Sequence, residues 1–322
     1  MLDLANRPKL GPYILTRELE ACAAFGSGGL SGTTAPAGAA ASGLGIPQRF
    51  LALHSSDQSS HVAYRFPAIK AGNDERRFQA AADAASRLSH AHILTIEQYG
   101  VDALGHPWVI APFTGDVDGV RPLSRLLREK GGQMDPLEVE RAMDQLLKAV
   151  AAAHAEITVP ALSATAGSIG NGAESGTHRP PPSLPLIHGP MSIDEILVDR
   201  RGALMVELYG LARSMRPSPR TPTLVAEMMR DEVRSVVEIG YQLITGLRAE
   251  EPIIPAGRLV PSHRLDRRID AWLTRGLDPT TGFDSAVQAM LALPSHAGQQ
   301  TRPSRLGTVR NVLSRLRATP EV

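Results

Sequence analysis

Residues 77–94 have the sequence RFQAAADAASRLSHAHIL, a helical segment followed by a polar loop with two histidines. Apolar residues recur in the first part at intervals of three and four, which predicts one face of a helix over 74–88. These residues are Phe78, Ala81, Ala82, Ala85 and Leu88. Asn73 directly precedes the helix and is predicted to cap it. A lone amphipathic helix must pack against other elements, so the flanking sequence decides the fold.

Segments typical of β-strands lie on both sides of this helix, since they mix β-branched, aromatic and alternating polar residues. Three precede the helix and two follow it: residues 13–19, 49–54 and 61–66, then 93–99 and 108–113. Gly105 is expected to form the turn between the last two. These segments predict a small sheet that carries one helix.

From Pro122 onward the pattern becomes helical. The predicted helices cover residues 122–130, 136–156, 230–246, 265–276 and 284–293. Residues 187–211 interrupt this series, with two short strands around the charged turn at 199–202. The second part of the chain is therefore predicted to be larger and mainly helical.

Two segments, 26–48 and 157–186, are rich in Gly, Ala, Ser, Thr and Pro. Neither can bury enough apolar surface to offset the entropy lost on ordering. We expect both to be flexible insertions in surface loops, because the entropy of loop closure grows slowly with length.

The composition indicates a globular protein and argues against a polyanion-binding one. The 322 residues are 43% hydrophobic, and 34 Lys and Arg nearly balance 33 Asp and Glu. Broad neutralisation of phosphates needs a basic excess, so nucleic acid is not expected as a partner. Cys22 is the only cysteine, which excludes an intramolecular disulfide and a cysteine-based zinc cluster.

No apolar run reaches the roughly 18 to 20 residues that a membrane-spanning helix needs. The first residues, MLDLANRPKLGP, also lack the apolar core of a secretory signal. These observations predict a cytoplasmic protein.

In this order, the segments resemble the two lobes of bacterial Ser/Thr protein kinases, over residues 11–293. Residues 77–94 resemble the kinase helix C with its following loop, and this is the most specific match. Further matches lie at residues 11–15 (first strand), 187–198 (catalytic loop), 206–213 (metal-binding motif), 232–246 (helix F) and 271–279 (the next helix). The resemblance implies a bilobal α+β fold with an N-lobe over 1–113, a C-lobe over 114–300 and a tail over 301–322.

The resemblance also assigns positions to the charged groups that phosphoryl transfer requires. The catalytic base position is Pro190, which has no side-chain acceptor. The two magnesium-ligand positions are Glu195 and Leu208. The phosphate-pairing lysine position is Arg65, and its expected glutamate partner is Ala81. No metal site is predicted, because one carboxylate without companions holds Mg²⁺ poorly.

Residues 19–25, LEACAAF, stand where the kinase family has a glycine-rich cover over the phosphates. A second register, through residues 68–70, would place Lys70 at the lysine position but crowds the following helix. The nucleotide cleft implied by the resemblance would include Arg65, Ala111 and Thr114. Without a phosphate cradle, no cofactor is predicted, although backbone groups near Ala111 and Thr114 could hold an adenine.

These substitutions predict a pseudokinase that acts as a signalling scaffold or regulatory protein-binding module. One alternative is a divergent Ser/Thr kinase that uses Glu195 or Glu207 with Asp199 and Lys70. Another is a structural interaction protein whose cleft has collapsed.

Other polar residues are predicted to be structural. Glu232 stands where kinases have an aspartate that holds the catalytic-loop backbone, and we expect the same role from it. His188 is expected to be a packed core histidine, and His90 and His92 are expected to pack in their loop. Glu195 is expected to be an exposed or ion-paired side chain.

Residues 302–322 carry five arginines with apolar residues at helical spacing, which predicts a basic amphipathic helix. It could pack on the C-lobe or dock on an acidic partner or a membrane surface. The sequence indicates a protein partner but does not identify it.

Overall fold

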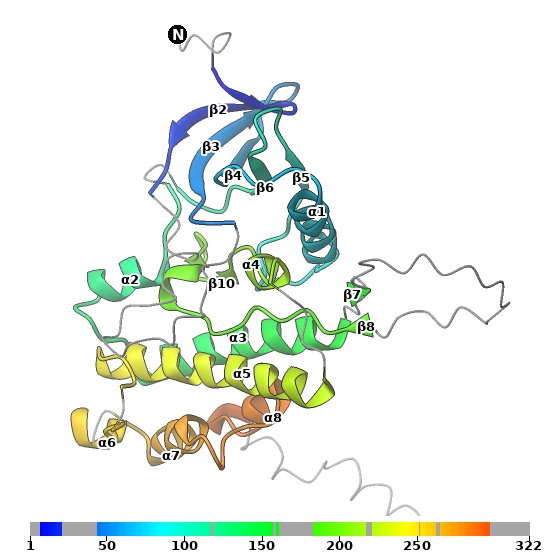
Figure 1. Ribbon diagram of the computed structural model, residues 1–322. Helices are drawn as coiled ribbons and strands as arrows, with labels where there is room; N and C mark the ends of the chain where they lie inside the picture. The colour runs from blue at the N-terminus through cyan, green and yellow to red at the C-terminus, as the bar shows by residue number, and fades with distance from the viewer. Residues whose placement is uncertain are drawn as a thin grey trace, which may run out of the picture.

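The computed structural model describes residues 7–20, 44–116, 119–156, 159–160, 183–216, 221–250, 252–261 and 265–296. Figure 1 shows two lobes, a curved sheet with helix α1 at its side and a larger helical lobe below. Cys22 and residues 302–322, with the helix predicted there, lie outside the described residues.

The N-lobe sheet is entirely antiparallel across the strands that the structure describes, in the order β1-β2-β3-β4-β6-β5. The strands are β1 (Lys9–Leu10), β2 (Tyr13–Glu18), β3 (Gln48–His54), β4 (Ser60–Arg65), β5 (Gln98–Val101) and β6 (Pro107–Pro112). Four of the five predicted strands match within two residues at each end. The fifth, predicted over 93–99, begins only at Gln98.

Alternation along β4 separates the two faces of the sheet. Val62 and Tyr64 face inward and belong to the buried apolar cluster that continues into the C-lobe. Ala63 belongs to a small separate cluster on the outer face, with Leu10 and Tyr13. One continuous core therefore joins the inner face of the sheet to the helical lobe.

Helix α1 (Asn73–Ser86) packs Phe78, Ala81 and Ala82 into this core, as predicted. The predicted N-cap was wrong by one residue. Gly72 is the cap, with φ 91°, and no side chain bonds the first turn. Glycine adopts this left-handed conformation without steric cost, whereas asparagine does so less readily.

The C-lobe helices are α2 (Leu123–Glu129), α3 (Pro136–Glu156), α4 (Leu211–Ser214), α5 (Pro222–Thr245), α6 (Ala256–Leu259), α7 (Arg267–Leu277) and α8 (Ala286–Leu291). Two short strand pairs accompany them, β7 (Val159–Pro160) with β8 (Ser183–Leu184), and β9 (Ile196–Val198) with β10 (Leu204–Val206). The predicted turn at 199–202 joins β9 to β10. Helices α4 and α6 were not predicted.

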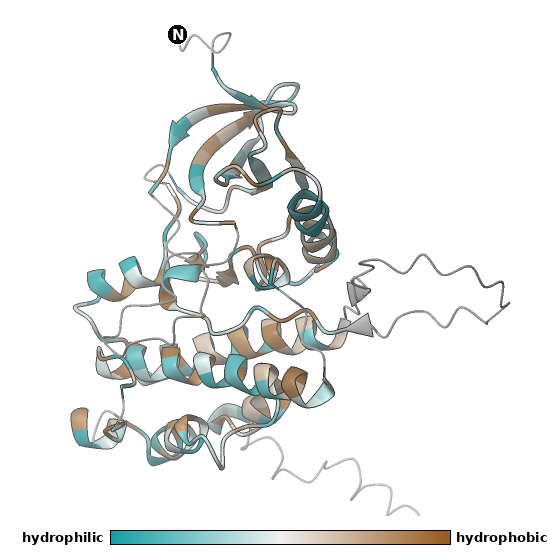
Figure 2. Cartoon of the chain, viewed as in Figure 1, coloured by the Kyte–Doolittle hydropathy of each residue, from teal (hydrophilic) through white to brown (hydrophobic). Residues whose placement is uncertain are grey.

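Helix α5 begins at Pro222, eight residues before the predicted start. The Thr221 hydroxyl accepts a hydrogen bond from the Leu224 amide, and proline follows the cap, which are both standard helix-start signals. In Figure 2 apolar and polar residues alternate around α5, so one stripe faces the core.

Both predicted insertions are too long at one end. Leu44 is buried and Gln48 opens β3, although the first insertion was predicted to run to 48. Leu186 is buried although the second was predicted to end there. The remaining parts of both segments, apart from β7 and β8, lie outside the described residues.

Within the described ranges, none of the helices combines the length and apolarity that crossing a bilayer would require.

Candidate functional site

The space between the lobes, where the resemblance implied a nucleotide, holds a buried cluster of Arg49, Tyr64 and Glu207. The Arg49 guanidinium lies 2.6 Å from one Glu207 carboxylate oxygen. The Tyr64 hydroxyl donates a hydrogen bond to the other oxygen. Arg49 Cζ also lies 5.8 Å from the centre of the Tyr64 ring. Both oxygens of the carboxylate are therefore engaged.

The fold brings these three groups together from distant parts of the sequence. Arg49 and Tyr64 are direct partners across β3 and β4, so their side chains leave the same face of the sheet. Glu207 follows β10, and its amide donates to the Glu195 carbonyl at 2.9 Å. The cluster therefore links the N-lobe sheet to the C-lobe turn directly below it.

Because the ion pair is buried, the stability of the fold is sensitive to the removal of either partner. The Arg49 and Glu207 side chains are 1% and 0% exposed. An unpaired charge in such a place is costly, and removing one partner of a buried pair destabilises by about 3–5 kcal/mol. Loss of one partner of this buried pair should therefore cost more than loss of one partner of an exposed pair, because the remaining charge is left uncompensated.

The structure corrects the register assigned to Arg65. Arg65 is the last residue of β4, and alternation places it on the opposite face from Tyr64. Its guanidinium lies 3.0 Å from the Asp102 carboxylate. The inward position belongs to Tyr64, a neutral phenol. Lys70 of the second register is exposed in the loop after β4.

The other two residues predicted for the nucleotide cleft lie in different environments. Ala111 is 0% exposed on β6, opposite Val62, which is also 0% exposed. Thr114 is half-buried and lines a cavity of about 620 Å³ next to α2 and α3. The nucleotide-binding role of Arg65, Ala111 and Thr114 stays a prediction.

On α1, the position that the resemblance gives to a glutamate is occupied by Ala81, and Asp83 lies two residues later. Ala81 is buried and offers no charge. Asp83 pairs instead with Arg87, one turn later on the same helix, at 2.6 Å.

The segment resembling a catalytic loop presents no proton acceptor at its base position. Pro190 is exposed, and Gly189 before it has φ 96°. The Leu208 side chain, at the main metal-ligand position, is 2% exposed within the core. Its backbone has φ 48°, a left-handed conformation that is uncommon for leucine.

Glu195 is buried, which corrects the expectation of an exposed or ion-paired side chain. Its carboxylate accepts the Ser192 amide at 2.6 Å and forms a capping box with Ser192. Burial raises the pKa of Glu195, an effect opposed by His188 and Ser192 and supported by the nearby Glu207 charge. Glu195 thus has a local structural role.

Glu232 of α5 holds the catalytic-loop segment, as predicted from the resemblance. One carboxylate oxygen accepts the His188 amide at 3.2 Å and lies 3.2 Å from His154 Nε2. The other accepts the Tyr209 hydroxyl, and burial together with the Glu232 charge raises the pKa of Tyr209. The His188 ring packs edge-on to Tyr209, with centroids 5.2 Å apart, as expected, whereas its buried Nδ1 has no hydrogen-bond partner among the described residues.

The residues proposed for a divergent active site are only partly brought together. Glu195 and Glu207 are neighbours through the backbone bond described above. The Asp199 carboxylate accepts the Arg201 and Ala203 amides at 2.8 and 2.7 Å, inside the β9–β10 turn. It is therefore committed to the turn.

His90 and His92 pack in their loop, as expected. Their ring centroids are 5.5 Å apart, and His92 Nδ1 lies 2.9 Å from the Leu204 carbonyl oxygen. Across the described parts of the chain, no group of three or more His, Cys, Asp or Glu side chains could hold a metal ion.

The sequence reasoning missed Arg49 and the role of Glu207. A signal was present, because Arg49 shares a strand face with Leu51 and Leu53 in the alternating pattern of β3. A cation on a core-facing position requires a buried anion. Which carboxylate supplies it depends on tertiary structure, since Glu207 lies 158 residues away.

Comparisons with known structures identify the fold. No protein-family model matches the chain, and no curated protein does. The chain is similar to crystal structures of the Mycobacterium tuberculosis PknI kinase domain. One has a TM-score of 0.60 at 17% identity and covers 92% of this chain and 99% of that one. A mutant of that domain has a TM-score of 0.58 at 18% identity and covers 92% and 100%. The chain therefore has the bilobal α+β fold of Ser/Thr protein kinase domains.

Proposed function

We propose that this chain is a pseudokinase, a regulatory or scaffolding module that binds protein partners and does not transfer phosphate. The main support is the buried cluster of Arg49, Tyr64 and Glu207. It fills the place between the lobes where charged groups would have to meet the phosphates of a nucleotide.

The charges needed for phosphoryl transfer are absent from their expected positions. Pro190 cannot accept a proton, and Leu208 cannot bind a cation. Glu207 is the carboxylate nearest to the metal position, but its two oxygens are used by Arg49 and Tyr64. A nucleotide would have to displace this cluster and leave Arg49 without its partner.

The burial of the cleft positions supports the same proposal. Val62, Tyr64, Ala111 and Leu208 are all at most 2% exposed. A nucleotide site needs accessible apolar surface for the base and accessible donors for the phosphates. The same burial is expected for the alternative of a structural interaction protein with a collapsed cleft.

Thermal unfolding of the full chain with ATP and Mg²⁺ tests nucleotide binding. A ligand at about 100 times its Kd stabilises the folded state by about 2.7 kcal/mol, which a melting curve detects. We expect no increase in Tm at millimolar ATP, with an active protein kinase as the positive control. A nucleotide-dependent rise in Tm would contradict the closed cleft.

A transfer assay with radiolabelled γ-phosphate tests catalysis separately. We expect no label on the chain itself or on a general protein acceptor. If label is transferred and Glu207→Gln abolishes it, the divergent-kinase alternative is correct and the pseudokinase proposal fails.

A further inference from the structure

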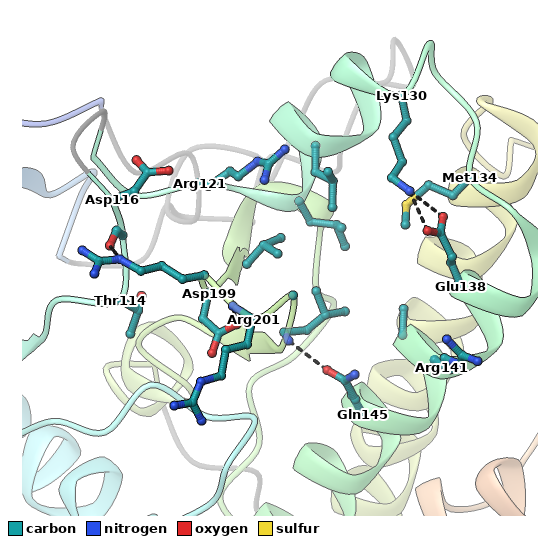
Figure 3. Close-up of a pocket in the computed structure, with 18 residues that line it drawn as sticks. Thr114, Asp116, Arg121, Lys130, Met134, Glu138, Arg141, Gln145, Asp199 and Arg201 are labelled. Carbon is teal, nitrogen blue, oxygen red and sulfur yellow. Dashed lines mark hydrogen bonds and ion pairs between the residues drawn. The ribbon is translucent and has the colours of Figure 1, made fainter.

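A second concave site lies outside the cleft, on the side of the C-lobe next to the connection between the lobes. It is the cavity of about 620 Å³ that Thr114 lines, enclosed by α2, α3 and the β9–β10 turn (Figure 3). We call it the basic groove. Its volume falls in the range of ligand-binding sites.

Cationic side chains outnumber anionic ones around the basic groove. The cations are Arg121, Lys130, Arg141, Arg200 and Arg201, and the anions are Asp116, Glu138 and Asp199. The whole chain, by contrast, has a formal net charge of +1. Arg121 is paired with Glu129 and Lys130 with Glu138, so the excess positive charge of the groove comes from Arg141, Arg200 and Arg201.

The anions of the groove are already engaged within the protein. Glu138 pairs with Lys130 at 2.6 Å. Asp199 accepts backbone amides within its turn. Asp116 is not without a partner either, and the charges of Asp116 and Asp199 only partly offset those of Arg141, Arg200 and Arg201.

Two of the arginines retain their full donor capacity. Among the described residues, the exposed side chains of Arg141 and Arg201 have neither an ion pair nor a side-chain hydrogen bond. Figure 3 shows them extending from opposite walls, α3 and the β9–β10 turn, with Gln145 between them. Arg200 uses one of its nitrogen donors, Nε, in a hydrogen bond to the Gly115 carbonyl oxygen at 2.7 Å. The groove thus presents several guanidinium donors without a partner anion.

The floor of the basic groove is apolar. It is formed by Leu123 and Leu126 of α2, Met134, Ala142 of α3 and Leu204 of β10. Leu126 and Met134 are only half-buried, so they offer surface to an incoming side chain. An apolar floor below a rim of arginines suits a ligand that carries both apolar groups and carboxylates.

We infer that the basic groove binds an extended acidic segment of a partner protein. In this arrangement Asp or Glu side chains pair with Arg141 and Arg201, and an apolar side chain of the same segment contacts Leu126 and Met134 on the apolar floor. The chain's own residues 302–322 do not suit the groove, because they carry five arginines of the same sign. The inference extends the proposed binding function by naming the partner's chemistry, but it is independent of the closed cleft.

The test is selection of random decapeptides displayed on phage against the full chain, followed by fluorescence polarisation with the selected peptides as synthetic labelled probes. We expect enrichment of Asp and Glu around an apolar residue. The double variant Arg141→Glu/Arg201→Glu should weaken binding at least tenfold. Raising the salt concentration should weaken binding to the natural chain, because ion pairs at an exposed rim are screened.

The matched control is Arg258→Glu/Arg268→Glu, which makes the same change in net charge at exposed positions of α6 and α7. It should leave the affinity within twofold. The inference is overturned if no peptides are selected, if they show no acidic enrichment, or if the two double variants bind them equally well. Phosphate transfer by the chain would defeat the pseudokinase proposal and leave this result untouched.

Discussion

At the scale of single residues, Glu207 is the group on which the space between the lobes depends most. Replacing it by alanine leaves the Arg49 charge buried without its partner. We expect Glu207→Ala to lower the free energy of unfolding by about 3–5 kcal/mol in denaturant titrations. The exposed pair of Arg87 and Asp83 provides the comparison, and Arg87→Ala should cost at most about 1 kcal/mol.

A double variant distinguishes the net contribution of the ion pair to stability from the cost of burying an unpaired charge. Arg49→Met/Glu207→Leu removes both charges, and such replacements of buried pairs are often neutral or stabilising. We expect it to be more stable than Glu207→Ala alone. Equal losses in the two variants would show that packing, rather than the orphaned charge, governs this position.

Glu195 gives the stability a measurable pH dependence. Burial raises its pKa above 4.5, so the folded state keeps the proton at pH values where the unfolded chain has released it. Its contribution to stability is therefore fully present below 4.5 and is lost as the pH rises through the raised pKa. Glu195→Gln cannot ionise, so its stability relative to the natural chain should increase with pH across this window.

Denaturant unfolding at a series of pH values checks this expectation. The control is Asp57→Asn, because hydrogen bonds from Ser59 lower the pKa of Asp57 from 3.8 to about 2. The stability conferred by Asp57 is lost only as the pH falls through those values, so its variant should show a flat difference above about pH 5. A flat difference for Glu195→Gln as well would contradict the raised pKa.

Single residues were predictable where the resemblance supplied a partner. The role of Glu232 followed from its place in helix F, because a carboxylate there reaches the His188 amide. The predicted register at Arg65 was wrong because sequence similarity locates a strand along the chain more reliably than it tells which of its residues face inward. A shift of one residue exchanges the two faces of a strand, and only the pairing with β3 and β6 fixes it.

At the scale of elements, the packing of α5 against α7 depends on Gly276. A Cβ there would lie 2.7 Å from Val237 Cγ2 and 2.9 Å from the Phe283 ring. Neither neighbour is a flexible chain end, so Gly276→Ala should cost about 1–3 kcal/mol through overpacking. Gly240→Ala is the matched control, because its closest neighbour is the flexible end of Met143 at 2.8 Å. Thermal unfolding of both variants should show the larger fall in Tm for Gly276→Ala.

Long periodic elements were predicted well from sequence, and short or irregular ones were not. Helix α3 matches its predicted bounds because its apolar stripe extends over many turns. The segment at 93–97 looked like a strand because it is apolar, but Ile93 forms only an isolated bridge with Val206. Its apolar side chains instead fill the core between the lobes. Helices of four residues, such as α4, carry too little periodicity to be recognised.

At the scale of the whole molecule, the continuous core and the buried ion pair should make the lobes unfold together. Hydrogen exchange can test this coupling. We expect Glu207→Ala to speed amide exchange in β3 and β4 more than in α5, because the sheet loses its attachment to the C-lobe. Arg65→Ala changes the same strand on its outer face and should leave exchange in β3 nearly unchanged. Uniform acceleration in both lobes for Glu207→Ala would mean that the pair stabilises the molecule without linking its halves.

The left-handed backbone at Leu208 has a consequence for the side chains that this position can accept. Leucine does not favour that conformation, so the turn owes its shape to its neighbours, including the bond from the Leu211 amide to the Leu208 carbonyl at 3.1 Å. Aspartate tolerates the same backbone better than leucine does. An aspartate introduced by Leu208→Asp would thus enter a turn already in a suitable shape. The main chain at position 208 therefore needs no change of conformation to accept an acidic side chain.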